Sequence, residues 1–288
     1  MLRKGDLTQG GIITTLLQFT LPMLAGSLLQ QCYNIADTLI VGQCIGANAL
    51  AAVGSAYTLM VFLISILLGL SMGSGTVFSL QYGAGDLSAL RRSIYVSLLL
   101  IGTVTILLNV AVFLWLDPIL RWLQVPYDIY SLMRNYLWII FWGIVFTFLY
   151  NFYAALLRAV GDSVTPLWFL AVSVVLNIGL DLFLILVLDQ GIEGAAVATV
   201  IAQGTAASGI LLYTYKTRPE LRLHREDMCF DRSSLREITS FSTLTCVQQS
   251  VMNFGILMVQ GLVNSFGTVV MAAFAAAVKI DSFAYMPC

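Results

Sequence analysis

Residues 93–116 read SIYVSLLLIGTVTILLNVAVFLWL, a run of 24 residues without a charged side chain. A helix needs about 20 mostly apolar residues to cross the hydrocarbon core of a bilayer, so this stretch is long enough to span one. Eight segments qualify by this measure: 12–40, 49–81, 93–116, 134–157, 166–188, 192–214, 238–262 and 270 to the end. Their residues do not alternate as the strands of a membrane barrel would. We therefore predict an all-α polytopic membrane helix bundle.

The composition excludes a soluble globular protein. Hydrophobic residues make up 59% of the chain and charged residues 10%, with a mean hydropathy of +0.90, whereas soluble domains carry about 25% charged residues. The five cysteines lack zinc-ligand spacing, and neither a phosphate loop nor a nucleophile elbow is present. We expect a multi-pass membrane protein that is not an enzyme, with no cofactor, no structural metal and no nucleic-acid partner.

The placement of lysine and arginine predicts the orientation in the membrane. Predicted loops on the opposite side from the N-terminus hold only Arg121 and Arg134. Basic residues favour cytoplasmic loops, so we expect a cytoplasmic N-terminus in the cell membrane. Eleven basic residues lie on the N-terminal side: Arg3, Lys4, Arg91, Arg92, Arg158, Lys216, Arg218, Arg222, Arg225, Arg232 and Arg236.

A weak internal repeat predicts the domain organisation. Residues 19–21 (FTL) align with 241–243 (FST), and Gly46 then falls on Gly267, about 221 residues later. A parallel repeat of six plus six helices is a known transporter plan and needs about 440 residues. We expect an N-lobe of six helices at 1–215, a cytoplasmic loop at 216–237, and the first two helices of a C-lobe at 238–288. The chain would then be C-terminally truncated. The glycines at 69, 73 and 75 predict close helix packing along the second span.

Charged residues inside the predicted spans mark the candidate site, because burying an ionised carboxylate in a bilayer costs at least about 2.5–3.5 kcal/mol. Away from the ends of the spans, such residues occur at four positions: Asp37, Asp181, Lys279 and Asp281. The first shares one helix face with Gln30 and Asn34 at spacings of four and three. We assign no role to Lys279 and Asp281.

Polar residues on three helices are expected at a similar depth. Asn177 and Asp181 are four apart on the fifth predicted helix, and Thr199 lies at a comparable depth on the sixth. Two carboxylates, Asp37 and Asp181, in a poorly hydrated pocket favour a proton site. The same oxygens, with Asn177 and Thr199, are also suitable sodium ligands. Helix-to-helix hydrogen bonding is the alternative role of Asn177 or Thr199 taken alone. Pro22 permits a bend in the first helix.

The chain resembles the multidrug and toxic compound extrusion (MATE) family over its whole length. The motifs that carry the resemblance are FTLPMLAGSLLQQCYNIADTLIVG (19–42), QYGAGD (81–86), LLRAVGDSVTP (156–166), LNIGLDLFLI (176–185), GAAVATVIAQ (194–203) and AAAVKIDSFAYMP (275–287). The resemblance implies twelve helices in two lobes around a central cleft. It also implies a monomeric antiporter that exports cationic or amphipathic small molecules by alternating access, in exchange for H+ or Na+.

The resemblance also implies which residues bind the coupling ion. Family members use an Asp on the first helix, an Asn and an Asp on the fifth and a Thr on the sixth. These positions are Asp37, Asn177, Asp181 and Thr199 here. A further Asn of the family is Ala154 in this sequence, and Asn151, one turn away, is the candidate substitute. The seventh helix has Gln248 and Gln249 but lacks the glutamate of some members, which favours coupling in the N-lobe. Pro22, Gln30 and Asn34 are the expected hinge and cavity residues.

Two other functions fit parts of the sequence. A lipid-linked oligosaccharide flippase has a related plan, but it needs more basic residues facing its cavity to hold a diphosphate. An intramembrane aspartyl protease needs two membrane aspartates and a GxGD string, which residues 83–86 (GAGD) match. Asp86, however, lies at the predicted cytoplasmic end of a helix, near Arg91 and Arg92, and not deep in a span.

Overall fold

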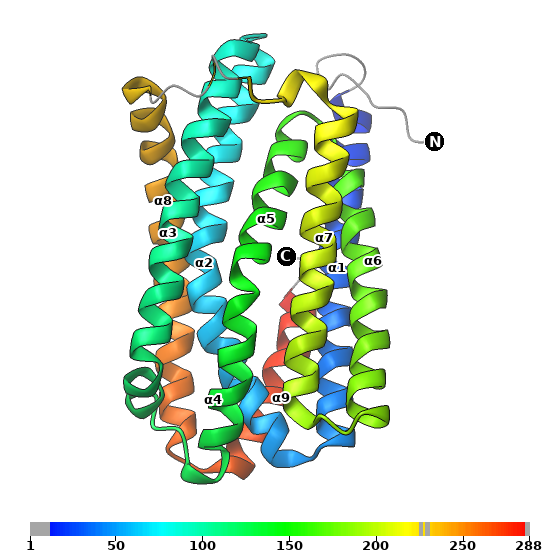
Figure 1. The fold of residues 1–288 in the computed structure, drawn as a ribbon, viewed down its shortest axis with the longest axis vertical. Helices are drawn as coiled ribbons and strands as arrows, with labels where there is room; N and C mark the ends of the chain where they lie inside the picture. The colour runs from blue at the N-terminus through cyan, green and yellow to red at the C-terminus, as the bar shows by residue number, and fades with distance from the viewer. Residues whose placement is uncertain (1–11, 225–226, 228–230, 286–288) are drawn as a thin grey trace.

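The computed structural model describes residues 12–224, 227 and 231–285. Figure 1 shows a bundle of long helices that run roughly side by side. The elements, in chain order, are α1 (Ile12–Cys44), α2 (Ala47–Gly83), α3 (Leu87–Trp122), α4 (Tyr127–Trp142), α5 (Ile144–Ala159), α6 (Val164–Leu182), the π-helical turn η1 (Phe183–Val187), α7 (Gly191–Thr217), the 3₁₀ turn η2 (Pro219–Leu221), α8 (Arg232–Asn264) and α9 (Thr268–Tyr285).

The predicted all-α membrane bundle is confirmed, since the described residues contain helices and no strand. Five helices in that part of the chain are long and apolar enough to cross a membrane, and the bent pair α4–α5 makes six. The helices α1 and α9 lie in the same bundle (Figure 1). Within the described residues, all eight segments predicted to span the bilayer are therefore helical.

The fourth predicted span is not one continuous helix. It was expected over 134–157, whereas α4 begins earlier, at Tyr127, and is separated from α5 by a 47° bend at Gly143. A side chain at Gly143 would come within 3.0 Å of the Ile140 carbonyl oxygen and of Val200 on α7. The missing side chain therefore lets α7 lie close against the bend.

Two other boundaries differ from the sequence-based expectation. The third span was expected to end at residue 116, but the backbone only kinks at Trp115 and α3 continues through Pro118 to Trp122. The loop predicted at 216–237 ends early because α8 begins at Arg232. The Asp231 carboxylate accepts hydrogen bonds from the Ser234 backbone N–H and hydroxyl, at 3.4 and 2.8 Å, and so caps the new helix.

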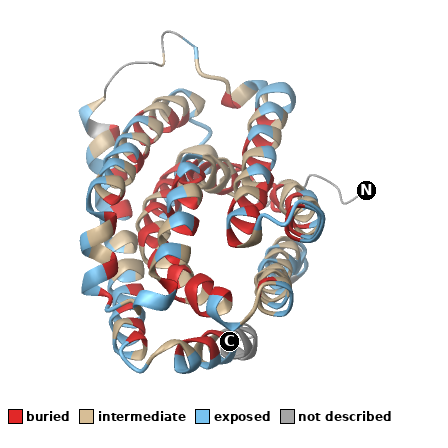
Figure 2. Cartoon of the chain, turned by 60° about the horizontal axis from the view of Figure 1, so that its bottom comes forward, coloured by how far each residue is buried: buried red, intermediate tan, exposed pale blue. Residues whose placement is uncertain are grey.

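The second helix forms the centre of the core. Fully buried residues occur along its whole length, from Ala52 through Leu67 to Phe78, and it contacts α3, α4, α5, α8 and α9. Buried residues lie mainly on the inward faces of the helices around it (Figure 2). The predicted close packing is confirmed. A side chain at Gly69 or Gly73 would come within 2.4 Å of the α8 backbone, and Gly75 faces Ala155 of α5.

The side chains of Lys279 and Asp281 lie outside the part of the structure that is described. The division into lobes at 1–215 and 238–288 stays a prediction.

Candidate functional site

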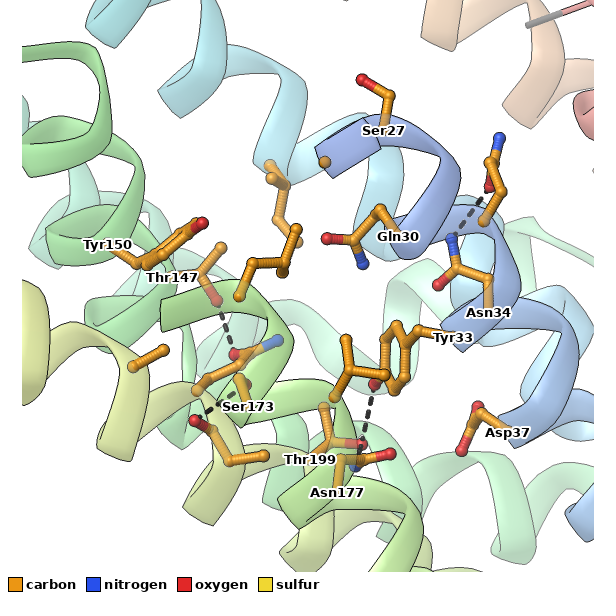
Figure 3. A pocket seen from close by; sticks show the side chains of 18 of the residues that line it. Ser27, Gln30, Tyr33, Asn34, Asp37, Thr147, Tyr150, Ser173, Asn177 and Thr199 are labelled. Carbon is orange, nitrogen blue, oxygen red and sulfur yellow. Dashed lines mark hydrogen bonds between the residues drawn. The ribbon is translucent and has the colours of Figure 1, made fainter. Parts of the chain in front are cut away.

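A cavity of about 580 Å³ lies between α1, α2, α5, α6 and α7. Its size is within the range of pockets that hold drug-sized ligands. Polar side chains reach it from α1, α5, α6 and α7 (Figure 3). Among the described residues that line it, the charged ones are Asp37 and Arg158.

A hydrogen-bond chain leads from the cavity wall to a buried carboxylate. The Asn177 amide satisfies its neighbours when its nitrogen faces Asp181. In that orientation it donates to Asp181 Oδ2 at 2.8 Å, and its oxygen accepts from the Thr199 hydroxyl at 3.3 Å and from the Thr199 backbone N–H at 3.2 Å. The Tyr33 hydroxyl lies 3.5 Å from the same threonine oxygen. Because the threonine hydroxyl has one proton, Tyr33 must donate to it.

The two candidate carboxylates occupy different positions. Asp37 lines the cavity and is half-buried, whereas Asp181 is fully buried and is not among the lining residues. Asp37 lies near Asn177, the hydrogen-bond donor to Asp181 (Figure 3). Asp181 Oδ2 accepts a hydrogen bond from the Asn177 side-chain amide. The other carboxylate oxygen of Asp181, Oδ1, is a buried acceptor without a hydrogen-bond partner. An unsatisfied buried carboxylate oxygen is a suitable place for a proton or a cation.

The remaining predicted site residues line the same cavity at other places. Asn151 donates to the Thr147 carbonyl at 2.8 Å within its own helix, and no bond in the described chain joins it to Asn177 or Thr199. Asn34 donates to Gln31 at 3.2 Å, and Gln30 is exposed. Helix α1 runs without a break through Pro22, which lies along its length.

Several lining residues were not anticipated from the sequence, among them Tyr33, Gln203 and Arg158. Tyr33 completes the chain to Thr199, and its position one turn before Asp37 is the signal that could have identified it. Gln203 accepts a 2.6 Å hydrogen bond from Thr147, which joins α7 to α5. Arg158 was placed with the cytoplasmic loops, yet it lines the cavity from the last turn of α5.

The GAGD string has a structural role. Gly85 adopts a positive φ of 74° in the turn after α2, a conformation that glycine adopts without strain. Asp86 then caps α3, with its carboxylate accepting from the Ala89 N–H at 2.9 Å and from the Ser88 hydroxyl at 2.7 Å. These two bonds hold the pKa of Asp86 below its usual range.

A helix bundle with membrane-spanning helices and a polar, drug-sized cavity is typical of a membrane transport protein. Sequence comparison assigns the family more closely. The MatE family profile matches residues 22–183, which is more than half of the chain. The protein belongs to this family, so the resemblance to MATE transporters is confirmed.

The relatives with curated names include proteins named for multidrug resistance and multidrug export. The chain is 34% identical to the probable multidrug resistance protein YpnP of Bacillus subtilis, over 98% of this chain and 63% of the relative. It is 27% identical to the multidrug export protein MepA of Staphylococcus aureus, over 94% of this chain and 60% of that protein. The chain thus spans about three fifths of the length of these relatives.

Solved structures share the fold. The Vibrio cholerae MATE transporter VcmN in its bent form matches with a TM-score of 0.79 and 26% identity, covering 95% of this chain and 62% of that one. A MATE structure in complex with MaD5 matches with a TM-score of 0.85 and 23% identity, covering 98% and 64%.

Proposed function

We propose that this protein exports small cationic or amphipathic compounds across the cell membrane, driven by a proton or sodium gradient. The names of the relatives support multidrug export. The cavity supports a small-molecule substrate because it has the volume for one and a mixed polar and apolar lining. The proposal includes no cofactor, and we propose that the exporter acts as a monomer.

The single observation that carries the coupling proposal is the position of Asp181. Its free Oδ1 is buried, and its Oδ2 ends a hydrogen-bond chain that starts at the cavity-lining Tyr33. A proton or sodium ion that binds here neutralises a carboxylate next to Asp37. The chain through Asn177 and Thr199 transmits that change to the cavity wall.

Alternating access follows if the ion binds one conformation better than the other. A bound ion shifts the equilibrium between two conformations only by its difference in affinity for them. The ion site joins α1, α6 and α7, and the cavity lies between the same helices. A shift of α1 relative to α6 and α7, with Pro22 as the flexible point, would therefore change the ion site and the substrate site together.

Transport by reconstituted proteoliposomes tests this proposal. A fluorescent organic cation is followed under a proton gradient and, separately, under a sodium gradient, and the effective gradient identifies the coupling ion. We expect Asp37→Asn and Asp181→Asn to abolish gradient-driven transport, because each removes a charge that the ion neutralises. Asp86→Asn is the matched control, since asparagine also caps helices well. Unchanged transport by Asp37→Asn would contradict the proposal.

A further inference from the structure

The cavity has an acidic end and a basic end. It follows α1 from Pro22 to Asp37, which is about 22 Å of helix at 1.5 Å per residue. Asp37 lies with Asn177 and Thr199 at one end. Arg158 lies in the last turn of α5, together with Ser163 and Pro166 at the start of α6. Asp37 belongs to the proposed ion site, so Arg158 is the charged side chain left for the substrate among the described lining residues.

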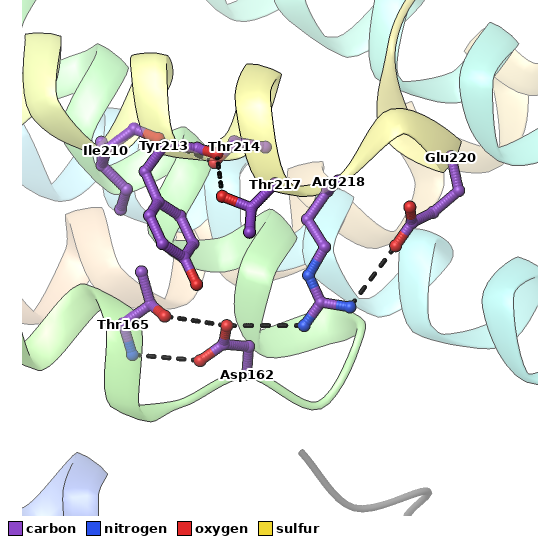
Figure 4. A network of polar contacts seen from close by, with 8 residues as sticks. All are labelled: Asp162, Thr165, Ile210, Tyr213, Thr214, Thr217, Arg218 and Glu220. Carbon is purple, nitrogen blue, oxygen red and sulfur yellow. Dashed lines mark hydrogen bonds and ion pairs between the residues drawn. The ribbon is translucent and has the colours of Figure 1, made fainter. Parts of the chain in front are cut away.

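Arg158 forms no ion pair with any carboxylate in the described part of the chain. The nearest acid in sequence, Asp162, is occupied by other groups (Figure 4). Its Oδ1 accepts from the Thr165 N–H at 3.0 Å, and its Oδ2 accepts from the Thr165 hydroxyl at 2.8 Å. Arg218 pairs with the same Oδ2 at 3.5 Å and with Glu220 at 3.4 Å. Asp162 is thus engaged by Thr165 and Arg218, and no ion pair in the described part of the chain joins it to Arg158.

The surroundings of Arg158 suit an anionic group on an otherwise apolar molecule. Arg158 is half-buried, and Met23, Leu167 and Leu170 add apolar lining to the cavity. A guanidinium binds a carboxylate through two parallel hydrogen bonds, and such pairs are stronger where water is partly excluded.

We propose that Arg158 is a specificity residue that binds the carboxylate of amphipathic substrates, so that the cavity accepts zwitterionic and acidic compounds as well as cations. This inference rests on the proposed export function. The competing role is purely structural, because an arginine in a last helical turn also stabilises the negative end of the helix dipole. A structural role is indifferent to the charge of the ligand.

A pair of dyes that differ in one group separates the two roles. The probes are a rhodamine with a free benzoate, which is a zwitterion, and its methyl ester, which is a cation. Binding of each to the purified 288-residue chain is measured by fluorescence anisotropy in detergent. We expect the wild-type chain to bind both dyes and Arg158→Gln to weaken binding of the acid by about 10- to 100-fold, with the ester changing much less. Arg158→Lys keeps the charge and should retain part of the affinity for the acid.

The control is Arg121→Gln, which removes an exposed arginine from the last turn of α3, outside the cavity. Both dyes should bind this variant as they bind the wild-type chain. An equal loss for acid and ester in Arg158→Gln would overturn the proposal, as would a wild-type chain that does not bind the acid. Phosphatidylglycerol that abolishes the effect of Arg158 would assign the site to a lipid phosphate and overturn it too. Arg158-dependent binding without gradient-driven transport would support this inference and contradict the proposed export function alone.

Discussion

At the scale of single residues, Thr199 is the junction of the candidate ion site. Its hydroxyl oxygen accepts a hydrogen bond from the Tyr33 hydroxyl. Its own hydroxyl and backbone N–H both donate to the Asn177 amide oxygen. The amide is therefore held with its nitrogen toward Asp181. This gives the hydrogen-bond chain one direction, from the cavity toward the buried carboxylate.

Removal of the Thr199 hydroxyl should break that chain. Thr199→Val conserves shape but leaves Tyr33 without its acceptor and Asn177 without one donor. We expect it to lower the free energy of unfolding by about 2 kcal/mol, because two hydrogen bonds with a net value of about 1 kcal/mol each are lost, and to weaken ion-driven transport. Thr199→Ser keeps the hydroxyl and should stay close to the wild type in both. Thermal unfolding in detergent measures the effect on stability, and proteoliposome transport measures the effect on function. Equal behaviour of the valine and serine variants would argue against the hydrogen-bond chain through Thr199.

The site was only partly predictable from its residues. Asp37 and Asp181 stand out because a charge in an apolar span is costly, and helical spacing places Asn177 beside Asp181. Tyr33 does not stand out, because a tyrosine in an apolar helix reads equally well as a packing residue. Arg158 does not stand out in the sequence either, because a charged residue near the end of a predicted span is usually assigned to the neighbouring loop. Whether such a residue turns into a cavity depends on the packing of α5 against α1 and α6.

At the scale of elements, α2 and α8 approach each other closely at two glycines of α2. Gly69 and Gly73 lie against the backbone of Cys246 and Ser242. The close approach lets Ser242 and Thr245 donate to the Leu70 and Gly69 carbonyls at 3.1 and 2.8 Å. In a membrane, the hydrophobic effect does not drive helices together, because lipid tails are as apolar as the side chains. Close packing of small residues and interhelical hydrogen bonds of this kind hold the helices together instead.

A methyl group at this contact should therefore destabilise the bundle. A side chain at Gly73 would lie 2.3 Å from the Ser242 Cα, and backbone there has no room to move aside. We expect Gly73→Ala to lower stability by about 1–3 kcal/mol. Gly255→Ala is the matched control on α8, because no atom lies within 4 Å of its added methyl, and it should be neutral or slightly stabilising. Melting temperatures in detergent distinguish the two, and a Gly73→Ala variant as stable as the control would refute the tight contact.

Hydropathy predicted which segments are helices better than where they break or begin. The bend at Gly143 depends on the close approach of α7, which a lone glycine in an apolar run does not reveal. The π-helical turn at Phe183–Val187 directly follows Asp181 and Leu182, and π-turns are frequent at functional sites but carry no residue signature. The start of α8 was missed because its first turn is polar, although Asp231 is a good N-cap.

At the scale of the whole molecule, two turns support the internal repeat. Gly46, between α1 and α2, has a φ of 118°, and Gly267, between α8 and α9, has a φ of 91°. The carbonyl of each glycine accepts a 3.1 Å bond from the fourth residue after it, Leu50 and Met271 respectively. The sequence alignment pairs these two glycines. Both turns need a backbone with positive φ, which glycine adopts without strain. The two aligned glycines therefore also match in their local backbone geometry.

The distribution of charge along the bundle predicts its orientation. The turn after α2 and the start of α4 lie at opposite ends of the molecule (Figure 1), and basic residues are concentrated at the end that holds the α2–α3 turn. In a background with the native cysteines replaced, Ala84→Cys places a thiol at an exposed position of that turn, and Tyr127→Cys places one at a position that is 98% exposed. Because basic loops stay in the cytoplasm, a membrane-impermeant maleimide added to intact cells should label residue 127 and reach residue 84 only after permeabilisation. The reverse pattern would invert the orientation and put the Arg158 end of the cavity outside the cell.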